Sequence, residues 1–393
     1  MNLGKKDHYI CPFCFTKHNL SEIGFICKND KANKDGDICV NAKAQRLIPH
    51  ESEINKITKS IKCDVCGEIV TTKVCPTCRA ELPYTIGEYE DLIFAVIGAK
   101  EAGKSHYIAV LIDKIMNEIG LAFNCSLQAI DDATIKRYRN DFYYPVFRNN
   151  QVIKVTRSAK ADDNVSKPLI YTLSFKEDSR ISKLLKGNNI KNVVTIAFFD
   201  TAGEDLNSED TMKTVNKYIY NSSGIIFLLD PLQLPIVRES ISKDIVLPQQ
   251  NAEIEDIFSR TANLIRKANG ISMNKEIKIP VAVAFSKIDA VEELLGKSCC
   301  INYPSKHVEA GEFVLADFED VNNTMESLVK QWGGVNFTNQ LSANFKEYAY
   351  FGLTSLGCNP ESNKINKLRP HRVEDPFLWL LWKHKLIKVQ KRK

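Results

Sequence analysis

The sequence lacks several features that would place it in a special class of protein. It contains no run of about 18 consecutive apolar residues, so we expect no transmembrane helix. The first residues, MNLGKKDHYICPFCF, contain no apolar core followed by a small-residue cleavage site, which argues against a secretory signal and favours the cytoplasm. There is no low-complexity segment, and a net charge of +5 over 393 residues is too small to indicate nucleic-acid binding by itself.

The composition is that of an ordinary globular protein. With 44% hydrophobic and 26% charged residues, the chain is neither wholly disordered, nor collagenous, nor a coiled coil. Its length allows two domains or three. The unusual feature is the distribution of its twelve cysteines, because eight of them fall within the first 78 residues. In a chain without an export signal, clustered Cys-x-x-Cys pairs indicate zinc rather than disulfides.

The sequence changes character near residue 90. Residues 1–82 are rich in Lys, Asp, Asn and Cys and cannot bury a large core without staples. Residues 83–90 are expected to be a linker to residues 91–393, where short apolar runs alternate with helical patterns. This alternation predicts an α/β fold with a mainly parallel six-stranded sheet and helices on both faces. The expected strands are Leu92–Ile97, Leu169–Phe175, Val193–Phe199, Ile225–Leu229, Val281–Phe285 and Tyr348–Leu353.

Other parts of the large domain are less regular. Residues 121–167 show no clear period, and residues 231–255 and 296–315 resemble insertions. Near the end of the chain, a helix is expected to pack on the sheet and to be followed by a solvated basic end. A basic helix on a membrane surface is the alternative. The residues expected on one face of this helix are Phe377, Leu378, Leu381 and Trp382.

The clustered cysteines predict two structural zinc sites. A Cys-x₂-Cys turn aims two thiolates at one ion, and four thiolates complete a tetrahedral site with no open position. Grouping by sequence order gives one site from Cys63, Cys66, Cys75 and Cys78. The other site is then formed by Cys11, Cys14, Cys27 and Cys39. His8 or His18 could replace a cysteine there, and the other interpretation is a surface histidine. Ordinary thiols are expected at Cys125, Cys299, Cys300 and Cys358.

A phosphate-binding loop is predicted after the first strand of the large domain. The segment LIFAVIGAKEAGKS matches G-x-x-x-x-G-K-[ST] between an apolar strand and a helical pattern. Its glycines let backbone N–H groups turn toward phosphate oxygens, and the helix N-terminus adds further donors. Lys104 is expected to contact the β and γ phosphates and Ser105 to bind Mg²⁺. The expected nucleotide-binding residues are Gly98, Ala99, Lys100, Glu101, Ala102, Gly103, Lys104, Ser105 and His106.

Three later motifs favour GTP over ATP. In VVTIAFFDTAG, a buried strand delivers Asp200 to hold Mg²⁺ through water, and Gly203 can meet the γ-phosphate with its N–H. In VAVAFSKID, Asp289 could accept from guanine N1–H and the N2 amine, which adenine lacks, while the Lys287 stem lies over the base. Ser286 replaces the more usual Asn of this motif. In FGLTSLG, the segment Thr354, Ser355 and Leu356 could contact the guanine oxygen through its backbone.

Taken in order, GAKEAGKS, DTAG, SKID and TSL resemble the motifs of Ras-like GTPases of the translation-factor-related (TRAFAC) class, over about residues 90–388. The resemblance implies binding of GTP and GDP with Mg²⁺ and a molecular switch. The fusion of such a domain to cysteine knuckles is similar to the bacterial double-GTPase group. Members of that group are thought to act in conflict or anti-phage systems, which implies a protein partner such as a second GTPase or an effector.

The hydrolytic residues are less clearly marked. Thr156 is the expected switch I ligand of Mg²⁺, Thr134 is the alternative, and either could be an ordinary strand or loop threonine. Glu204 stands where Ras-like enzymes have the glutamine that orients the attacking water. Because a carboxylate would repel the γ-phosphate, we expect slow intrinsic turnover. The expected catalytic set is Lys104, Gly203 and Glu204.

Arg148 and Arg157 lie in the presumed switch I region. Each could act as an internal arginine finger, and the simpler interpretation of each is a solvated charge.

The charge of residues 1–82 favours docking to a protein over binding to nucleic acid. This part has 13 Lys/Arg and 10 Asp/Glu, and two zinc ions held by eight thiolates make it about neutral. The sequence thus predicts a GTPase switch with two zinc ions. The alternatives are a GTP-gated binding module with negligible hydrolysis and a P-loop ATPase with nucleic-acid-binding zinc fingers.

Overall fold

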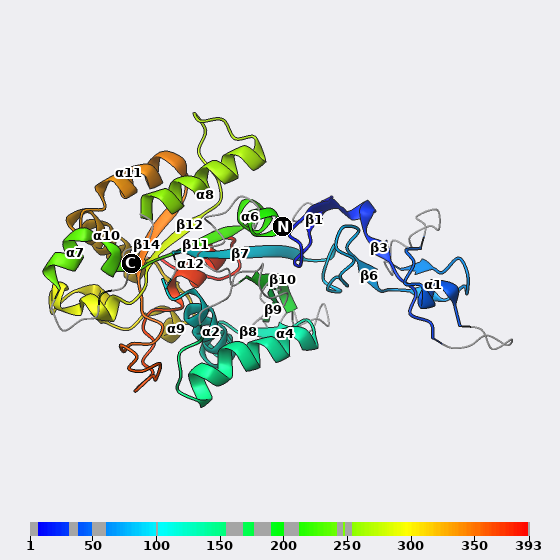
Figure 1. The fold of residues 1–393 in the computed structure, drawn as a ribbon, viewed down its shortest axis with the longest axis horizontal. Helices are drawn as coiled ribbons and strands as arrows, with labels where there is room; N and C mark the ends of the chain where they lie inside the picture. The colour runs from blue at the N-terminus through cyan, green and yellow to red at the C-terminus, as the bar shows by residue number, and fades with distance from the viewer. Residues whose placement is uncertain are drawn as a thin grey trace. The chain divides into compact units, whose positions relative to one another are not determined.

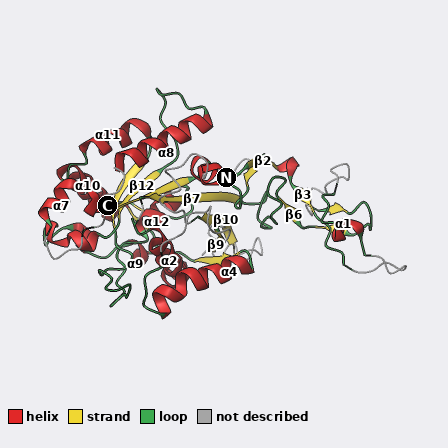
Figure 2. Cartoon of the chain, in the orientation of Figure 1, coloured by secondary structure: helices red, strands yellow, loops and turns green. Residues whose placement is uncertain are grey.

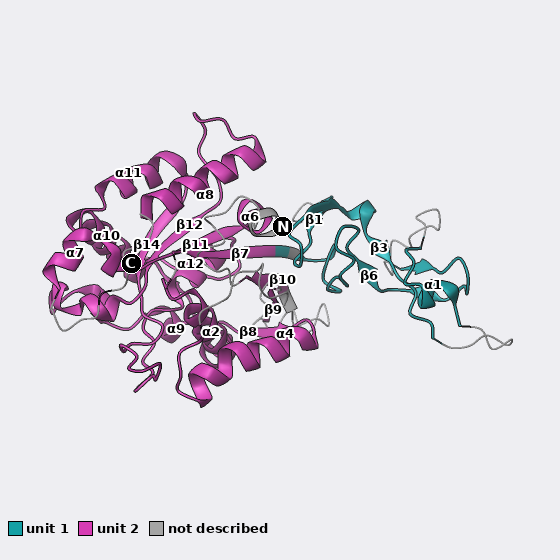
Figure 3. Ribbon diagram, in the orientation of Figure 1, with its two compact units in different colours: residues 1–91 teal, residues 92–393 magenta. Residues whose placement is uncertain are grey.

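The computed structural model describes residues 7–30, 38–48, 60–99, 101–154, 168–176, 190–199, 212–241, 247 and 254–391. The chain divides into two compact units, Met1–Asp91 and Leu92–Lys393 (Figure 3). Among the helices within these ranges, none combines the length and the apolar character needed to cross a membrane.

The first unit, which we call the zinc module, is built from very short elements. Three antiparallel pairs form its framework, and they join β1 to β2, β3 to β6 and β4 to β5. The elements are β1 His8–Ile10, β2 Lys17–Asn19, a 3₁₀ turn Leu20–Glu22, β3 Gly24–Phe25, α1 Val40–Lys43, β4 Ile61–Lys62, β5 Ile69–Val70 and β6 Lys73–Val74. Their small core combines a few apolar side chains with cysteines.

Residues 83–90, expected as a linker, are folded onto the zinc module. Ile86 is fully buried in the module's core. Lys73 Nζ donates to the carbonyls of Tyr84 (3.3 Å) and Ile86 (3.0 Å). The compact part of the module therefore extends to about Asp91.

The second unit, the α/β domain, contains a seven-stranded sheet with the order β14-β12-β11-β7-β10-β9-β8 (Figures 1 and 2). From β7 to β14 the pairs are parallel, whereas β9 pairs antiparallel with both β10 and β8. The predicted α/β class is confirmed. The strands are β7 Glu90–Gly98, β8 Cys125–Ala129, β9 Leu169–Lys176, β10 Ile190–Phe198, β11 Gly224–Leu229, β12 Val281–Phe285 and β14 Tyr348–Gly352.

The sheet has one strand more than the six predicted, because β8 pairs with β9 at its edge. β8 belongs to the segment without a clear period. Only its first residue is buried and the others are half-buried or exposed, so no apolar run marks it in the sequence.

Helices cover both faces of the sheet. α2 and α12 pack on the face that carries Phe94, Val96 and Phe351, and Phe227 on the opposite face meets Phe258 of α8 and Phe337 of α11. The helices are α2 Lys104–Lys114, α3 Gly120–Ala122, α4 Asp132–Arg137, α6 Met212–Tyr220, α7 Pro235–Ser240, α8 Ile254–Asn269, α9 His307–Ala310, α10 Leu315–Gln331, α11 Val335–Asn344 and α12 Asp375–Lys383. Wider π-helical turns follow α2 at Ile115–Ile119 and α4 at Tyr138–Arg148, and 3₁₀ turns form at Pro231–Gln233, Ile288–Leu294 and Cys300–Asn302.

The C-terminal helix packs on the sheet as expected. Phe377 of α12 lies edge-on to Phe94 of β7, with ring centroids 5.8 Å apart. The helix is buried on more than the predicted face, since Trp379 and Leu380 are also buried and Trp382 is half-buried. Beyond it, β15 Val389–Gln390 pairs with β13 Phe313–Val314, so the alternative of a helix on a membrane surface does not describe this end of the chain.

Candidate nucleotide site and zinc centres

Three of the predicted motifs follow parallel strands at one edge of the sheet. Gly98 at the end of β7 pairs with Leu228 of β11, and Leu229 pairs with Phe285 at the end of β12. Phe285 in turn pairs with Gly352 at the end of β14. Residues 98–106, 286–289 and 354–356 therefore begin at the same carboxyl edge, where open α/β sheets bind their ligands.

The phosphate loop is shaped by its two glycines. A Cβ on Gly98 would collide with the carbonyl oxygen of Leu228, so only glycine allows the end of β7 to lie this close to β11. Gly103 has a φ of 83°, which a side chain would strain, and it is the N-cap of α2. Its carbonyl accepts from Tyr107 N (2.8 Å), the first hydrogen bond of that helix.

Lys104 is almost fully buried, with 7% of its surface exposed. Its Nζ donates to the backbone carbonyls of Gly98 (3.0 Å) and Ala99 (2.8 Å). The ammonium group therefore lies inside the curl of the loop. Ser105 follows in the first turn of α2 and is half-buried.

His106 connects the start of α2 to a distant segment. Its Nε2 accepts a hydrogen bond from Ile153 N (3.0 Å), so this nitrogen carries no proton and the imidazole is neutral. Burial, with a smaller effect from the positive charge of Lys287, lowers its pKa to about 4. Ile153 is two residues before residue 155, where the predicted switch I region enters the part of the chain that the structure does not describe.

Ser286, which stands where asparagine is more usual, is anchored to the neighbouring strand. Both its N–H (2.8 Å) and its Oγ (3.0 Å) donate to the carbonyl of Leu229. On the other side, Ile288 N donates to the carbonyl of Leu353 (3.1 Å). The predicted base-binding loop is thus held between the ends of β11 and β14.

Two polar groups near the ends of β12 and β14 have no partner within the described ranges. Oδ1 of Asp289 is buried and makes no hydrogen bond there. Ser355 is buried, and among the described residues no backbone carbonyl accepts from its N–H, whereas Thr354 N and Leu356 O are engaged by His371 and Arg369. An acceptor and a donor are the two kinds of group that would meet the N1–H, N2 amine and O6 of guanine.

Sequence reasoning missed Asp230, which directly follows β11. Its Oδ2 accepts from Lys287 Nζ at 2.6 Å, and its Oδ1 accepts from Leu232 N at 2.9 Å. The signal was available, because an acidic residue directly follows the predicted strand Ile225–Leu229 at the functional edge.

Tyr218 of α6 was also missed. Its hydroxyl donates to the carbonyl of Phe94 (2.7 Å) and accepts from Val96 N (3.0 Å) on β7. It also accepts from Phe199 N (3.3 Å), just after β10. One buried phenol therefore joins the phosphate-loop strand to the strand that leads into the DTAG motif.

Several predicted residues lie outside the described residues, namely Lys100, Thr156, Arg157, Asp200, Gly203 and Glu204. Thr134, the alternative magnesium ligand, is buried in α4 and its Oγ1 accepts from Ile170 N (3.4 Å) of β9. The hydroxyl is thus engaged with the sheet, and the choice of the magnesium ligand stays a prediction. Arg148 is exposed at the end of its helical turn, as a solvated charge would be.

In the zinc module, three Cys-x₂-Cys turns share one backbone geometry. In each, the N–H four residues after the first cysteine donates to that cysteine's carbonyl, with N···O distances of 2.9, 2.9 and 3.0 Å. That residue has a positive φ in every case: Phe15 (55°), Gly67 (72°) and Arg79 (63°). The shared geometry explains the Cys-x₂-Cys spacing, because the turn brings both sulfurs to one side.

The eight cysteines form two tetrads, as the predicted number of sites requires. Within each tetrad all sulfurs lie within 4.8 Å of one another. Two S···S distances in each tetrad are 3.7 or 3.8 Å, and a zinc tetrahedron with Zn–S bonds of about 2.3 Å has edges of about 3.8 Å. The spacing of the thiols therefore fits a tetrahedral zinc ion in both tetrads.

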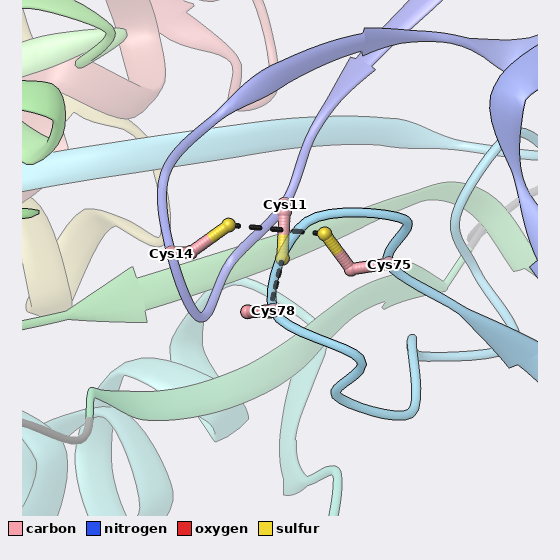
Figure 4. Close-up of side chains that lie close together, drawn as sticks. All are labelled: Cys11, Cys14, Cys75 and Cys78. Atoms are coloured by element: carbon pink, nitrogen blue, oxygen red, sulfur yellow. Dashed lines mark hydrogen bonds between the residues drawn. The ribbon is translucent and has the colours of Figure 1, made fainter. Parts of the chain in front are cut away.

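The membership of the tetrads differs from the sequence-order grouping. Cys11 and Cys14 join Cys75 and Cys78, as Figure 4 shows, and the other four cysteines of the module form the second tetrad: Cys27, Cys39, Cys63 and Cys66. The cause is the antiparallel pair β3–β6, in which Gly24 lies opposite Val74 and Phe25 opposite Lys73. Since the two strands run in opposite directions, Cys27 and Cys75 emerge at opposite ends of the pair.

His18 is neither a zinc ligand nor a surface residue. It is buried, and its Nε2 lies 3.5 Å from Cys75 Sγ and 3.3 Å from Thr77 Oγ1. Its Nδ1 lies 3.4 Å from a carboxylate oxygen of Glu22. The ring therefore contacts a sulfur of the tetrad from outside it, as groups that support metal ligands do.

A third group of potential ligands, His307, Asp317 and Asp375, is occupied by an arginine. Arg372 Nη1 lies 2.9 Å from Asp317 and 2.8 Å from Asp375, and although burial opposes ionisation, this guanidinium lowers the pKa of Asp317. His307 Nδ1 accepts from Val314 N (3.0 Å), so its proton sits on Nε2 and blocks metal binding there. The group is a buried ion-pair network.

The comparisons with known proteins found distant likenesses. No protein-family profile matches the chain. A curated protein similar to it is the putative ESX-1 scaffolding and assembly protein SaeC of Mycolicibacterium smegmatis, with 21% identity over 322 residues, 78% of this chain and 79% of that protein. A similar solved structure is the Arl6 BBS3 small GTPase of Trypanosoma brucei with a bound nucleotide analogue, GppNp. Its identity is 12% and its TM-score 0.31, over 75% of this chain and 98% of that chain. Both identities are too low to show the family of this chain.

Proposed function

We propose that the chain is a Mg²⁺-dependent GTP-binding and GTP-hydrolysing switch whose zinc module docks a protein partner. The observation that carries the nucleotide assignment is a pair of groups at the carboxyl edge. Asp289 Oδ1 makes no hydrogen bond within the described residues, and no described backbone carbonyl accepts from Ser355 N–H. They share that edge with a phosphate loop that already holds the ammonium of Lys104 in its curl. A buried acceptor left unpaired by adenine would cost binding energy, which favours guanine.

For hydrolysis we propose the residues that the sequence motifs mark. Ser105, Thr156 and Asp200 would hold Mg²⁺, which neutralises phosphate charge when bound. The Gly203 N–H would meet the γ-phosphate and Glu204 would orient the water. A carboxylate in that position repels phosphate, so slow turnover that depends on a partner is expected.

For the zinc module we propose a docking role in the cytoplasm. Four thiolates around each ion leave no position for a catalytic water, so the zinc ions are structural. The module is nearly neutral with both ions bound, which does not favour nucleic acid. A similar protein carries a name that describes scaffolding and assembly, which supports a protein partner. Action within a bacterial defence system stays a prediction from the sequence.

Calorimetric titration with Mg²⁺ and GTP, GDP, ATP or XTP tests the nucleotide assignment. Lys104→Ala is expected to weaken GTP binding by about 100-fold or more, because charge-assisted bonds to phosphate are lost. Asp289→Asn should weaken GTP by about 10-fold or more and strengthen XTP, whose base presents an acceptor to the amide. Equal affinity of the unaltered protein for ATP and GTP would contradict the guanine assignment.

Single-turnover hydrolysis separates the switch from its alternative. Slow release of phosphate that Glu204→Ala changes would support an enzyme. No release, even with a cognate partner, would leave a GTP-gated binding module.

A further inference from the structure

Asp230 carries a deeply buried carboxylate near the predicted base site. This residue was not identified from the sequence. Only 3% of its side chain is exposed, and both of its oxygens are engaged. Oδ1 accepts from Leu232 N and caps the 3₁₀ turn after β11. Oδ2 takes the ammonium of Lys287 at 2.6 Å, a short charge-assisted contact.

A second carboxylate, that of Asp289, follows Lys287 by two residues along the chain. The structure pairs the lysine with Asp230 on the neighbouring strand instead. The backbone of Lys287 is left-handed (φ 54°, ψ 36°), the conformation in which the side chain makes this contact. Asp289 Oδ1 is left buried and, within the described residues, without a hydrogen bond.

Asp230 and Asp289 would compete for the ammonium group if the Lys287 side chain can turn to either carboxylate. If the ammonium group turned from Asp230 to Asp289, it would occupy the acceptor that a guanine base needs. An anion at position 230 stabilises the other arrangement, since a buried carboxylate retains its partner strongly.

We propose that Asp230 is a positioning residue for purine specificity. It holds the ammonium of Lys287 away from Asp289, so that Asp289 remains an open acceptor for the N1–H and N2 amine of guanine. The inference rests on the proposed function, because it concerns how the same site selects its base.

Binding of GDP and IDP by the full chain tests the inference, since hypoxanthine lacks only the N2 amine. The test variant is Asp230→Asn, whose amide oxygen can still accept from Leu232 N while the anion is lost. We expect the GDP:IDP affinity ratio, about 10 or more in the unaltered protein, to fall toward 1. Glu239→Gln on α7, which removes an exposed carboxylate nearby, is expected to leave the ratio unchanged.

The decisive measurement is a rescue. In Asp230→Asn/Lys287→Met no ammonium is left to occupy Asp289, so the ratio should return to within about threefold of its original value. A parallel loss of GDP and IDP affinity in Asp230→Asn, or a ratio that the second substitution does not restore, would overturn the proposal.

If Asp230→Asn does not fold, Lys287→Met alone decides. An unchanged GDP:IDP ratio would support the inference and a ratio near 1 would overturn it. Failure of the proposed function gives a different result, because the unaltered protein would then bind neither GDP nor IDP.

Discussion

The zinc module and the α/β domain solve the same problem of stability in different ways. Five of the 13 residues in the module's described core are cysteines, against one of 38 in the described core that α2 and α12 share with the sheet. Strands of two or three residues bury little apolar surface, so the module needs cross-links, whereas the domain can rely on its core. The comparison predicts that zinc, once bound, stabilises the module and leaves the stability of the α/β domain unchanged.

The largest expected effect concerns the module, because structural zinc contributes about 10–16 kcal/mol to the folding of small zinc domains. Cys14→Ser and Cys75→Ser remove members of the same cysteine tetrad. Either variant, and also the double variant, should retain one zinc per chain by elemental analysis. Cys14→Ser/Cys27→Ser should retain none, because these residues belong to different tetrads.

The sequence-order grouping predicts the reverse pattern for the two double variants, so the assay decides between the groupings. Cys358→Ser, outside the module, is the control and should keep both ions. Tryptophan fluorescence adds a test of the comparison, since all three tryptophans, Trp332, Trp379 and Trp382, lie in the α/β domain. If a zinc chelator shifts the unfolding midpoint that these tryptophans report, the stability of the α/β domain depends on zinc and the comparison fails.

The next effect concerns the domain's buried ion pairs. Arg372→Met leaves Asp317 and Asp375 buried without their cation, which typically costs about 3–5 kcal/mol. Urea unfolding followed by tryptophan fluorescence measures the loss. Arg369→Met removes the same charge from an exposed position and should change the midpoint little. Equal, small effects of both substitutions would show that this network does not support the domain.

The two regions also differ in how far the sequence could predict them. Six strands and the phosphate loop could be predicted from local apolar runs and glycine spacing. Strands such as β7 and β12 each contain an apolar run that marks them in the sequence. The cysteine grouping depends on the pairing of β3 with β6, two strands of two residues each that no local pattern reveals. Tyr218 was missed for the same reason, since its hydroxyl contacts residues on β7 and next to β10. Asp230 is different, because its place directly after a predicted strand was a usable signal.

A smaller effect is expected at Tyr218, whose hydroxyl satisfies three backbone groups of the domain. Tyr218→Phe leaves the N–H groups of Val96 and Phe199 and the carbonyl of Phe94 without this partner. With about 1–3 kcal/mol for an unsatisfied buried group, we expect a loss of about 3 kcal/mol in the tryptophan-detected unfolding free energy. Tyr220→Phe, two residues later in α6, is the matched control and should cost less than 1 kcal/mol, roughly. A loss no larger than that of the control would mean that water or the β7–β10 pairing replaces the phenol.

The smallest effect depends on pH and concerns His106. Its folded pKa of about 4 lies below the ordinary value of 6.5, so the unfolded chain binds more protons between these values. Stability from this group is therefore fully present above about pH 6.5 and falls as the pH drops toward 4, by about 2 kcal/mol at pH 5. His106→Gln can offer Oε1 to Ile153 N in place of Nε2 and does not titrate. Urea midpoints measured by tryptophan fluorescence at pH 7.5 and 5 should thus diverge less in this variant than in the unaltered protein. If the urea midpoints of the variant and of the unaltered protein differ equally between the two pH values, other groups cause the acid sensitivity. The contact between α2 and Ile153 would then not depend on a neutral imidazole.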